Sequence, residues 1–267
     1  MKLTEIATKD APALNKNRPL LDALDLMDKQ GLDSICVSDD GKIVGYLSYA
    51  DILTKIGTQR LRAVSPGSLY ISGFMSNFPA AVSNDTSVRK AAKLMLELNA
   101  DLLPMFYGDM FLGAVYRSSM VKAVQDREVG TPQLMRRKFP SVRSSDRAIH
   151  ARKLILESGT PVIPVLNDDG RYLGAVTRGA LLKALVDFHM YVPEKHQKAR
   201  IRQLSISNVM KVDYPSIGEE STLGDVVRKI LAERCPGVVV VNGLSPVGIV
   251  TTDEILAFIV NTFPEEQ

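Results

Sequence analysis

The chain has 267 residues, with 33 basic and 30 acidic side chains, a formal net charge of +3 and 45% hydrophobic residues. This near-balance of charge argues against nucleic-acid binding, because such proteins usually carry a clustered basic face. The longest apolar runs are too short to span a membrane, and residues 1–6 lack the apolar core of a signal peptide. The two cysteines, Cys36 and Cys235, follow aliphatic patterns, so we expect them to be buried in a protein of the reducing cytoplasm.

Four similar phrases recur along the chain, each with a glycine that closes an aliphatic strand and precedes a helix. A proline leads each glycine by 33 or 34 residues. This regular spacing indicates four copies of one supersecondary unit, because chance rarely holds one gap constant over four copies. The proline and glycine pairs are Pro12 and Gly45, Pro79 and Gly113, Pro140 and Gly174, and Pro215 and Gly248.

Each unit is predicted to contain a first strand, a helix, two strands joined by a tight turn, and a closing helix. The first unit has these elements over residues 20–30, 34–38, 43–47 and 49–56. The second unit has a helix over residues 87–98 and strands over 103–106 and 111–115.

The third unit shows the same order, with more local signals. Ser144, Ser145 and Asp146 are expected to cap a helix that Gly159 ends. Prolines in the strand over 161–166 favour an edge or an irregular start, and a turn leads to the returning strand over 172–176. Thr177 is expected to cap a helix over 179–186. The fourth unit has a predicted helix over 222–233 and strands over 238–241 and 247–250.

The joins between the units suggest how the units are grouped. Residues 57–70 and 187–204 are long joins, whereas only residues 125–130 separate the second unit from the third. A single unit of roughly 55 residues buries little surface by itself. We therefore predict two modules of paired units that pack sheet to sheet. The modules are 1–125, with units of about 1–57 and 70–125, and 127–267, with units of about 127–187 and 204–262.

The unit resembles the CBS domain, named after cystathionine β-synthase. The resemblance is carried by the leading segments 71–75 and 207–210, the strand–turn–strand with Asp-Gly, and the closing phrase of glycine, two aliphatics, Ser or Thr, two residues and an acid. A chain of four such units resembles the regulatory gamma subunit of AMP-activated protein kinase and its archaeal relatives. The resemblance implies an α/β (α+β) fold of β-α-β-β-α repeats in two tandem pairs, called Bateman modules, with adenosine-containing ligands in the clefts between paired units.

The resemblance also implies which residues hold the ligand. A hydroxyl at the helix start faces a phosphate, and an acid one turn later accepts the ribose hydroxyls. Ser48 and Asp51 give the first unit the full pattern, although a serine before a helix is by itself more often a simple N-cap. The partner surface in the second unit would be formed by Ile71, Met75, Ala100, Asp101 and Leu102.

The other units depart from this pattern. The fourth has Thr251 and Glu254, with Asp253 one place early. Its partner surface would be formed by Thr131, Met135, Thr160, Pro161 and Val162. The third unit keeps Thr177 but has Ala180 at the acid position, so beside Arg178 we expect a site for phosphate, or for a nucleotide held through its phosphates. The second unit has Tyr116 and Ser119 and is expected to be empty or degenerate. Met210 is expected to line a pocket wall.

Basic residues near the leading segments and helix starts have two interpretations. They either supply positive charge to phosphates at the module centre or form a solvated basic face. These residues are Arg117, Arg136, Arg137, Lys138, Arg178 and Lys211.

The four units leave no residues for a catalytic domain, and the common catalytic motifs are absent from the sequence. We therefore expect no enzyme activity, cofactor or metal. The leading hypothesis is a cytoplasmic energy sensor that binds AMP, ADP or ATP, forms a homodimer or an intrachain disc of two modules, and acts on an unidentified partner protein. The alternatives are an interaction scaffold with vestigial clefts, S-adenosylmethionine as the ligand, and nucleic-acid binding through the basic stretch 195–202, which the small net charge disfavours.

Overall fold

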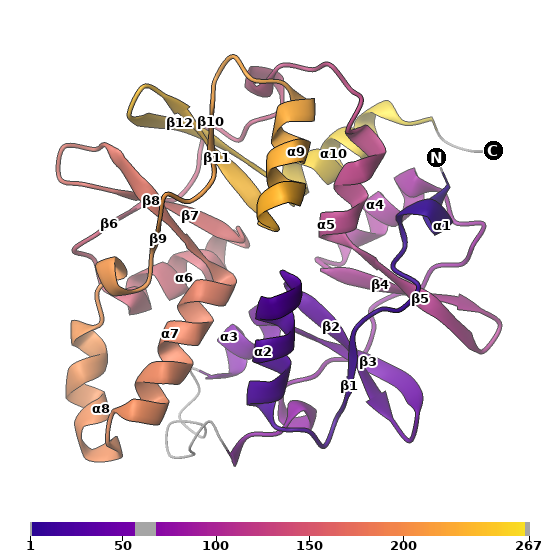
Figure 1. The fold of residues 1–267 in the computed structure, drawn as a ribbon, viewed down its shortest axis with the longest axis horizontal. Helices are drawn as coiled ribbons and strands as arrows, with labels where there is room; N and C mark the ends of the chain where they lie inside the picture. Colours follow the sequence, from indigo (N-terminus) through magenta and orange to yellow (C-terminus); the bar gives the residue numbers. More distant parts are fainter. Residues whose placement is uncertain (1, 57–67, 265–267) are drawn as a thin grey trace.

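The computed structural model describes residues 2–56 and 68–264 and arranges four repeats around a common centre (Figure 1). We number the repeats 1 to 4 in chain order, as the four predicted units. Around the ring they follow the order 4, 2, 1, 3, so that repeat 1 faces repeat 4 across the centre. Most of the predicted join between repeats 1 and 2 lies outside the described residues.

Repeat 1 contains a sheet of order β1-β2-β3, in which β1 runs parallel to β2 and β2 pairs antiparallel with β3. Helix α2 is followed by Gly31, whose left-handed backbone (φ 63°) turns the N–H of Leu32 back to the carbonyl of Met27 at 2.9 Å. The elements of repeat 1 are α1 (Leu3–Ile6), β1 (Ala13–Asn15), α2 (Leu20–Gln30), β2 (Ser34–Asp39), β3 (Lys42–Ser48) and α3 (Tyr49–Ile56).

Repeat 2 has the same order, but its first strand is reduced to one bridge between Val82 and Met105. Its elements are η3 (Ile71–Gly73), α4 (Val88–Glu97), β4 (Leu102–Tyr107), β5 (Met110–Tyr116), α5 (Arg117–Met120) and η4 (Val121–Val124).

Repeats 3 and 4 share a strand, because β9 leaves repeat 4 and pairs with β8 of repeat 3. Repeat 3 contains η5 (Thr131–Gln133), β6 (Val142–Arg143), α6 (Ala148–Ser158), β7 (Val162–Leu166), β8 (Tyr172–Thr177) and α7 (Arg178–Tyr191). The connection to repeat 4 contains α8 (Glu194–Arg200) and η6 (Ile201–Gln203). Repeat 4 contains η7 (Ile206–Asn208), β9 (Lys211–Val212), β10 (Ser216–Gly218), α9 (Leu223–Glu233), β11 (Gly237–Asn242), β12 (Ser245–Thr251) and α10 (Thr252–Thr262).

Three local expectations for repeat 3 need correction or refinement. The predicted cap by residues 144–146 is wrong, because the N-cap of α6 is Arg147 and carries no side-chain cap. Asp146 instead accepts a hydrogen bond from the backbone N of Arg143 at 2.8 Å. Helix α7 runs beyond the predicted end at residue 186, and α8 follows it in the predicted join. Strand β7 lies between β6 and β8 in its sheet, but β6 pairs only with Val165 and Leu166. Pro164 therefore lies in the part of β7 that has no strand partner on the β6 side, which a proline tolerates.

Each closing glycine lies where the leading segment of another repeat crosses its strand. A side-chain carbon at any of these glycines would collide with the crossing chain. The crossings are Gly45 with Met75 and Ser76, Gly113 with Thr8 and Lys9, Gly174 with Lys211, and Gly248 with Met135. Repeats 1 and 2 therefore exchange leading segments with each other, and so do repeats 3 and 4. Glycine is required at these positions because the chains approach too closely for a Cβ.

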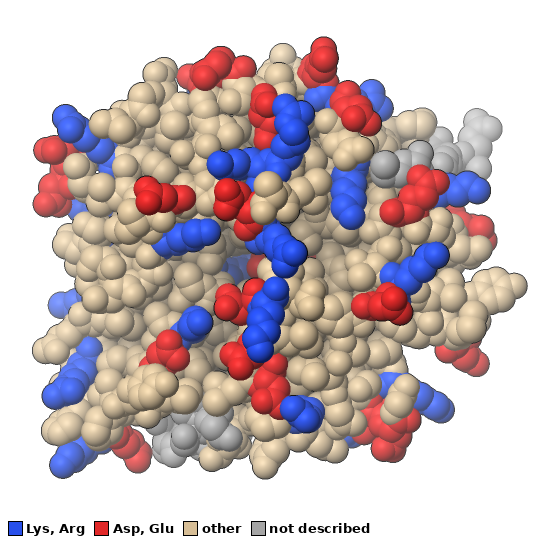
Figure 2. Space-filling view, in the orientation of Figure 1, with Lys and Arg blue, Asp and Glu red and all other residues tan. Residues whose placement is uncertain are grey.

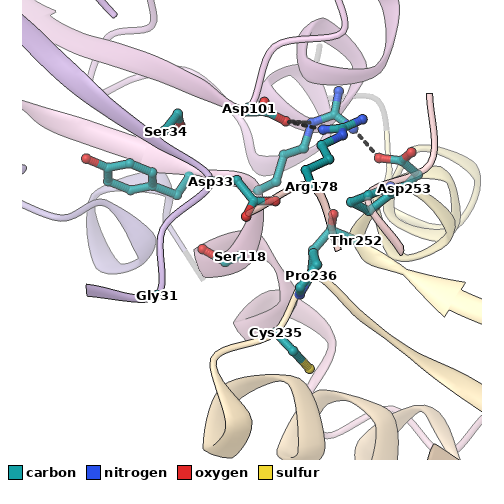
Figure 3. A pocket seen from close by; sticks show the side chains of 13 residues that line it. Gly31, Asp33, Ser34, Asp101, Ser118, Arg178, Cys235, Pro236, Thr252 and Asp253 are labelled. Carbon is teal, nitrogen blue, oxygen red and sulfur yellow. Dashed lines mark hydrogen bonds and ion pairs between the residues drawn. The ribbon is translucent and has the colours of Figure 1, made fainter. Parts of the chain in front are cut away.

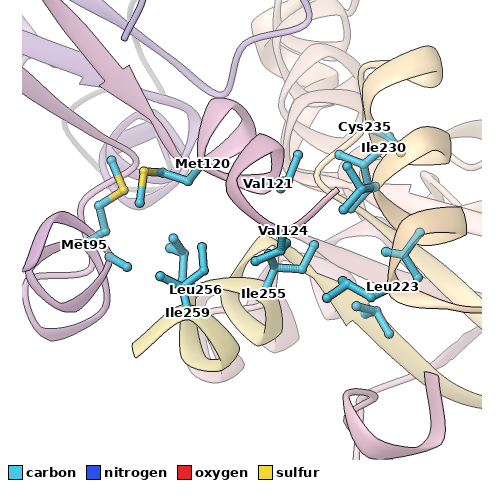
Figure 4. Close-up of a cluster of buried hydrophobic side chains, with 14 of the residues drawn as sticks. Met95, Met120, Val121, Val124, Leu223, Ile230, Cys235, Ile255, Leu256 and Ile259 are labelled. Carbon is cyan, nitrogen blue, oxygen red and sulfur yellow. The ribbon is translucent and has the colours of Figure 1, made fainter. Parts of the chain in front are cut away.

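Hydrophobic cores join repeats across the two pairs. In one core, α4 of repeat 2 packs on α10 of repeat 4, with Met95 and Met120 facing Leu256 and Ile259 (Figure 4). The other core joins repeats 1 and 3, where α3 packs on α6 and α7. A small cluster that includes Cys36 fills the space between the sheets of repeats 1 and 2. Sheet contacts thus act within a pair, and helix contacts act between pairs.

Candidate functional site

The centre of the ring is formed by two positions of every repeat: the residue just before the first hairpin strand and the residue that begins the closing helix. In chain order these residues are Asp33 and Tyr49, Asp101 and Arg117, Pro161 and Arg178, and Pro236 and Thr252. All of them except Tyr49 line a central cavity of about 30 Å³, together with Asp253 (Figure 3). Such a volume holds about two ordered waters and no nucleotide.

Arg117 is buried and fully engaged at this centre. Its Nε donates to the carbonyl of Ala100 at 2.7 Å, and Nη2 donates to the carbonyl of Met95 at 2.7 Å. Its guanidinium also forms an ion pair with Asp253 of repeat 4. Because the Met95 carbonyl belongs to the last turn of α4, the cation caps the negative end of that helix.

Arg178 has the equivalent position in repeat 3. It donates to the carbonyl of Gly159, which follows α6, and its Nη1 lies 3.5 Å from Oδ1 of Asp101. The Nε of Arg117 lies 3.7 Å from the same carboxylate oxygen. Burial raises the pKa of Asp101, and the two guanidinium groups oppose that rise. Asp101 is therefore a buried acid between two cations.

Asp33 has in repeat 1 the position that Asp101 has in repeat 2, but no arginine forms an ion pair with it in the described ranges. In the described ranges its carboxylate accepts no hydrogen bond and forms no ion pair. Figure 3 shows the side chain pointing into the cavity. Burial, and next the charge of Asp101, raise its pKa to about 6 against the weaker opposing effect of Arg178 and Arg117.

A larger cleft of about 440 Å³ opens from the same centre and shares Asp33 with the cavity. Its walls are the C-terminal ends of α2 and α9 and the N-terminal end of α7. Gly31 and Arg234, which follow α2 and α9, touch each other there. Tyr49 of repeat 1 packs against Gly179 of repeat 3 and lines the same cleft. The volume lies in the range of small-molecule sites.

Charged side chains of both signs line this cleft. Figure 2 shows side chains of both signs running down the middle of this face of the molecule. Lys183 Nζ lies 3.9 Å from Asp28, and Lys229 Nζ lies 3.8 Å from Glu233. The remaining cations of the lining form no ion pair with any described residue: Lys29, Lys211 and Arg234. Arg234 Nη1 donates to the carbonyl of Lys29 at 3.5 Å. The lining therefore carries four cations and three acids, Asp28, Asp33 and Glu233.

The CBS domain profile matches three segments of the chain, residues 3–58, 129–187 and 206–261. The chain belongs to the CBS domain family. Repeat 2 lies outside the matched segments, but its described residues follow the same order of elements around the same centre. We therefore treat all four repeats as CBS repeats.

Solved structures show the same fold. The crystal structure of protein MJ1225 from Methanocaldococcus jannaschii, described as a candidate archaeal homologue of γ-AMPK, has a TM-score of 0.79 and 16% identity over 97% of this chain and 99% of that chain. An uncharacterized conserved protein from Pyrococcus horikoshii has a TM-score of 0.63 and 17% identity over 97% of this chain and 100% of that chain.

One curated relative is the uncharacterized protein MJ1404 of Methanocaldococcus jannaschii, which is 25% identical over 274 residues. The match covers 96% of this chain and 61% of the relative, so the chain spans about three fifths of that protein.

The predicted residues Ser48 and Asp51 of CBS repeat 1 are bonded to each other. Ser48 Oγ donates to Asp51 Oδ2 at 2.5 Å and accepts from the backbone N of Asp51 at 3.1 Å. Ser76 Oγ, from the leading segment of repeat 2, donates to the other carboxylate oxygen at 3.0 Å. Of the predicted partner surface, Asp101 lies at the ring centre, and the rest are fully or partly buried: Ile71, Met75, Ala100 and Leu102.

In CBS repeat 4, both carboxylate oxygens of Glu254 accept hydrogen bonds from protein groups. Its Oε2 accepts from the backbone N of Thr251 at 2.8 Å and from Oγ1 at 2.6 Å. Arg136 of repeat 3 donates to Oε1 at 2.8 Å, and Asp253 pairs with Arg117. The predicted partner residues in repeat 3 are all buried: Thr131, Met135, Thr160, Pro161 and Val162.

CBS repeat 3 presents its hydroxyl to the open cleft. Thr177 Oγ1 accepts from the backbone N of Ala180 at 3.1 Å as the N-cap of α7, and both residues line the cleft. Arg178 lines the central cavity instead, where Asp101 and the carbonyl of Gly159 occupy its guanidinium. Met210 packs partly buried against the core of repeats 1 and 3.

In CBS repeat 2, a tyrosine occupies the hydroxyl position of the family pattern and packs into the interface between two sheets. The Tyr116 ring is buried in the cluster that contains Cys36, Leu102 and Ala114, between the sheets of repeats 1 and 2. Its hydroxyl has no hydrogen-bond partner among the described residues. Ser119 Oγ donates to the carbonyl of Tyr116 at 2.8 Å and so serves the helix start.

Sequence reasoning missed Asp33 and Tyr49 as parts of the site. The spacing within the repeats could have identified them, because Asp33 and Asp101 each stand 12 residues before the closing glycine. Tyr49 likewise stands four residues after its glycine, as Arg117 and Arg178 do. Aligning the repeats on the glycine would have placed all of these residues at one shared location.

Within the described ranges, no three His, Cys, Asp or Glu side chains are grouped to hold a metal, and no helix is both long and apolar enough to cross a membrane. Both cysteines are buried, and burial raises the pKa of Cys36 to about 12.

Proposed function

We propose that this CBS-domain protein is a non-catalytic regulator that binds an adenosine-containing ligand in the cleft lined by repeats 1, 3 and 4. The observation that carries the proposal is the open cleft of about 440 Å³ at the N-terminal end of α7, where Thr177 holds the hydroxyl of the family pattern. Helix α7 has 14 residues, so its N-terminal end carries the partial positive charge of a full helix dipole. AMP, ADP and ATP are the first ligands to test, followed by S-adenosylmethionine.

The position of the cleft explains how binding would regulate the protein. Its lining comes from three repeats, with Tyr49 of repeat 1, Gly179 of repeat 3 and Pro236 of repeat 4. A ligand that touches all three surfaces spans both repeat pairs. It would favour the relative packing of the pairs in which its contacts are best, and it shifts that equilibrium only by its difference in affinity for the two states.

Titration calorimetry on ligand-free protein tests the proposal. We expect heat of binding from at least one of AMP, ADP, ATP and S-adenosylmethionine. The variant Ala180→Trp should abolish this heat, because the indole would occupy the cleft, whereas His150→Trp, at an exposed position of α6, should leave it unchanged. Wild-type protein that gives no heat with any of the four ligands would overturn the proposed function.

An interaction scaffold is the second candidate function. It is favoured because other residues of the family pattern already contact protein groups. The Tyr116 ring packs between the sheets of repeats 1 and 2, and Arg136 donates a hydrogen bond to Glu254. A partner protein that binds with the same affinity in the presence and absence of every adenosine ligand would favour this function over ligand sensing.

A further inference from the structure

The connection from α7 to α8 exposes apolar side chains at the outer edge of the ring (Figure 1). Tyr191, the last residue of α7, is 77% exposed, which is the largest exposed fraction of any large hydrophobic side chain that the structure describes. Met190 beside it is 40% exposed. Single exposed apolar residues are common on protein surfaces, so the charges around this pair decide what it is able to bind.

Free cations follow this apolar pair along α8. Residues 191–203 contain four basic residues and one acid, Glu194, so this stretch has the same formal charge of +3 as the whole chain. Lys195, Arg200 and Arg202 are exposed, and none of them forms an ion pair with any described residue. Figure 2 shows mainly Lys and Arg side chains along the lower left edge of the molecule, where Figure 1 places α8.

A second basic stretch, residues 136–143, shows that such freedom is not general in this chain. It also contains four cations, but three of them lie within 4.0 Å of acids from other parts of the chain. These pairs are Arg136 with Glu254, Arg137 with Glu219, and Arg143 with Asp168. The cations that follow Tyr191 are therefore free to contact a partner, whereas those of 136–143 are largely neutralised within the chain.

The helical hairpin of α7 and α8 holds the apolar pair and the cations in one arrangement. Gln197 Nε2 donates to the carbonyls of His189 at 3.2 Å and of Val192 at 2.8 Å, so α8 is bonded to the end of α7. Ile201 and Leu204, which follow α8, pack against the core of repeats 1 and 3. A partner that binds here therefore does not have to order the segment first.

An anionic lipid surface fits this combination better than a nucleic acid does. Apolar and aromatic side chains beside a row of cations are typical of segments that lie at membrane interfaces, where the cations attract anionic lipids. A nucleic acid binds chiefly through its phosphates and would gain little from the exposed methionine. The α7–α8 connection also lies at the outer edge of the ring, so it reaches a flat surface without obstruction by the centre (Figure 1).

We propose that the α7–α8 rim, formed by Met190, Tyr191, Lys195, Arg200 and Arg202, docks the protein on an anionic membrane surface. The two apolar side chains enter the head-group layer, and the three cations lie over the anionic head groups. Each cation near such a surface strengthens binding about fivefold. The inference is independent of the ligand in the cleft, because no residue of the rim lines that cleft.

Co-sedimentation of the full chain with lipid vesicles tests the proposal. Vesicles of mixed phosphatidylglycerol and phosphatidylcholine supply the anionic surface, and pure phosphatidylcholine vesicles should bind at least about tenfold more weakly. Arg200→Gln combined with Arg202→Gln should weaken binding to the anionic vesicles about 25-fold, and Tyr191→Ser should weaken it about fivefold. All three positions are exposed, so the melting temperatures should remain those of wild type.

Matched controls separate the rim from general charge and exposure. Lys42→Gln combined with Lys90→Gln removes the same charge from exposed positions of repeats 1 and 2, and Tyr107→Ser removes a tyrosine that is 65% exposed beside Asp109. Both controls should bind as wild type does.

Three results would overturn the proposal: wild type that does not bind the anionic vesicles, controls that weaken binding as much as the rim variants do, or Tyr191→Ser that binds like wild type. Duplex DNA that binds wild type more tightly than the vesicles do, and binds Tyr191→Ser equally well, would assign the rim to nucleic acid instead.

Discussion

Replacing Asp33 with asparagine should stabilise the ligand-free protein at neutral pH. Burial, and next the charge of Asp101, raise the pKa of Asp33 from 3.8 to about 6, so the folded state holds this proton more tightly than the unfolded chain does. Stability therefore falls as the pH rises between these two values, and the full cost of the charged acid is present above about pH 6. At 1.36 kcal/mol per pKa unit this cost is about 3 kcal/mol, and screening of a partly exposed group lowers the expected gain to about 1–3 kcal/mol.

Urea unfolding of wild type and Asp33→Asn at about pH 4 and about pH 7.5 measures this gain. We expect similar free energies of unfolding at the lower pH and a more stable variant at the higher pH. Asp109→Asn, at an exposed turn, is the matched control and should show no difference at either pH. A variant that is equally or less stable than wild type at about pH 7.5 would refute the reasoning, because it would mean that a cation or solvent already satisfies Asp33.

Three further predictions follow from the packing and the site. Gly45→Ala should cost about 1–3 kcal/mol in urea unfolding, because its Cβ would lie 2.5 Å from a backbone carbonyl of the crossing segment, whereas Gly73→Ala, with open space around it, should cost less than about 1 kcal/mol. Arg178→Met should lower the free energy of unfolding by about 3–5 kcal/mol, since it removes a cation from buried Asp101, and an undiminished melting temperature would contradict this role. Asp51→Ala should leave ligand affinity in calorimetry unchanged, whereas a loss of about 1.5–3 kcal/mol would place the ligand at the Ser48 and Asp51 pair instead.

The fold was readable from the sequence because its signals are local and repeated. The spacing of Pro12 from Gly45 and its three counterparts marks the repeats, and the bounds of α2 and α3 coincide with the predicted helices at 20–30 and 49–56. Thr177 caps α7 as its position before an apolar helix predicts. Residues 144–146 show the limit of such signals, since a capping side chain is also able to bond within its own turn.

The site was less readable because its residues meet through contacts between distant repeats. The pattern gives Ser48 with Asp51 and Thr251 with Glu254 similar chemistry, but Ser76 and Arg136 reach these acids from other repeats. Side chains that reach in from another repeat determine which cleft is open, and the residue spacing within one repeat does not predict them. The ion pairs of Arg117 and Arg178 with Asp253 and Asp101 were likewise hidden, because they form only when the four repeats close the ring.

A crystal structure of the protein with its tightest adenosine ligand tests the central claim most directly. The account predicts ligand density in the cleft lined by repeats 1, 3 and 4, beside Thr177 at the N-terminal end of α7. Density at Ser48 and Asp51 alone would contradict it.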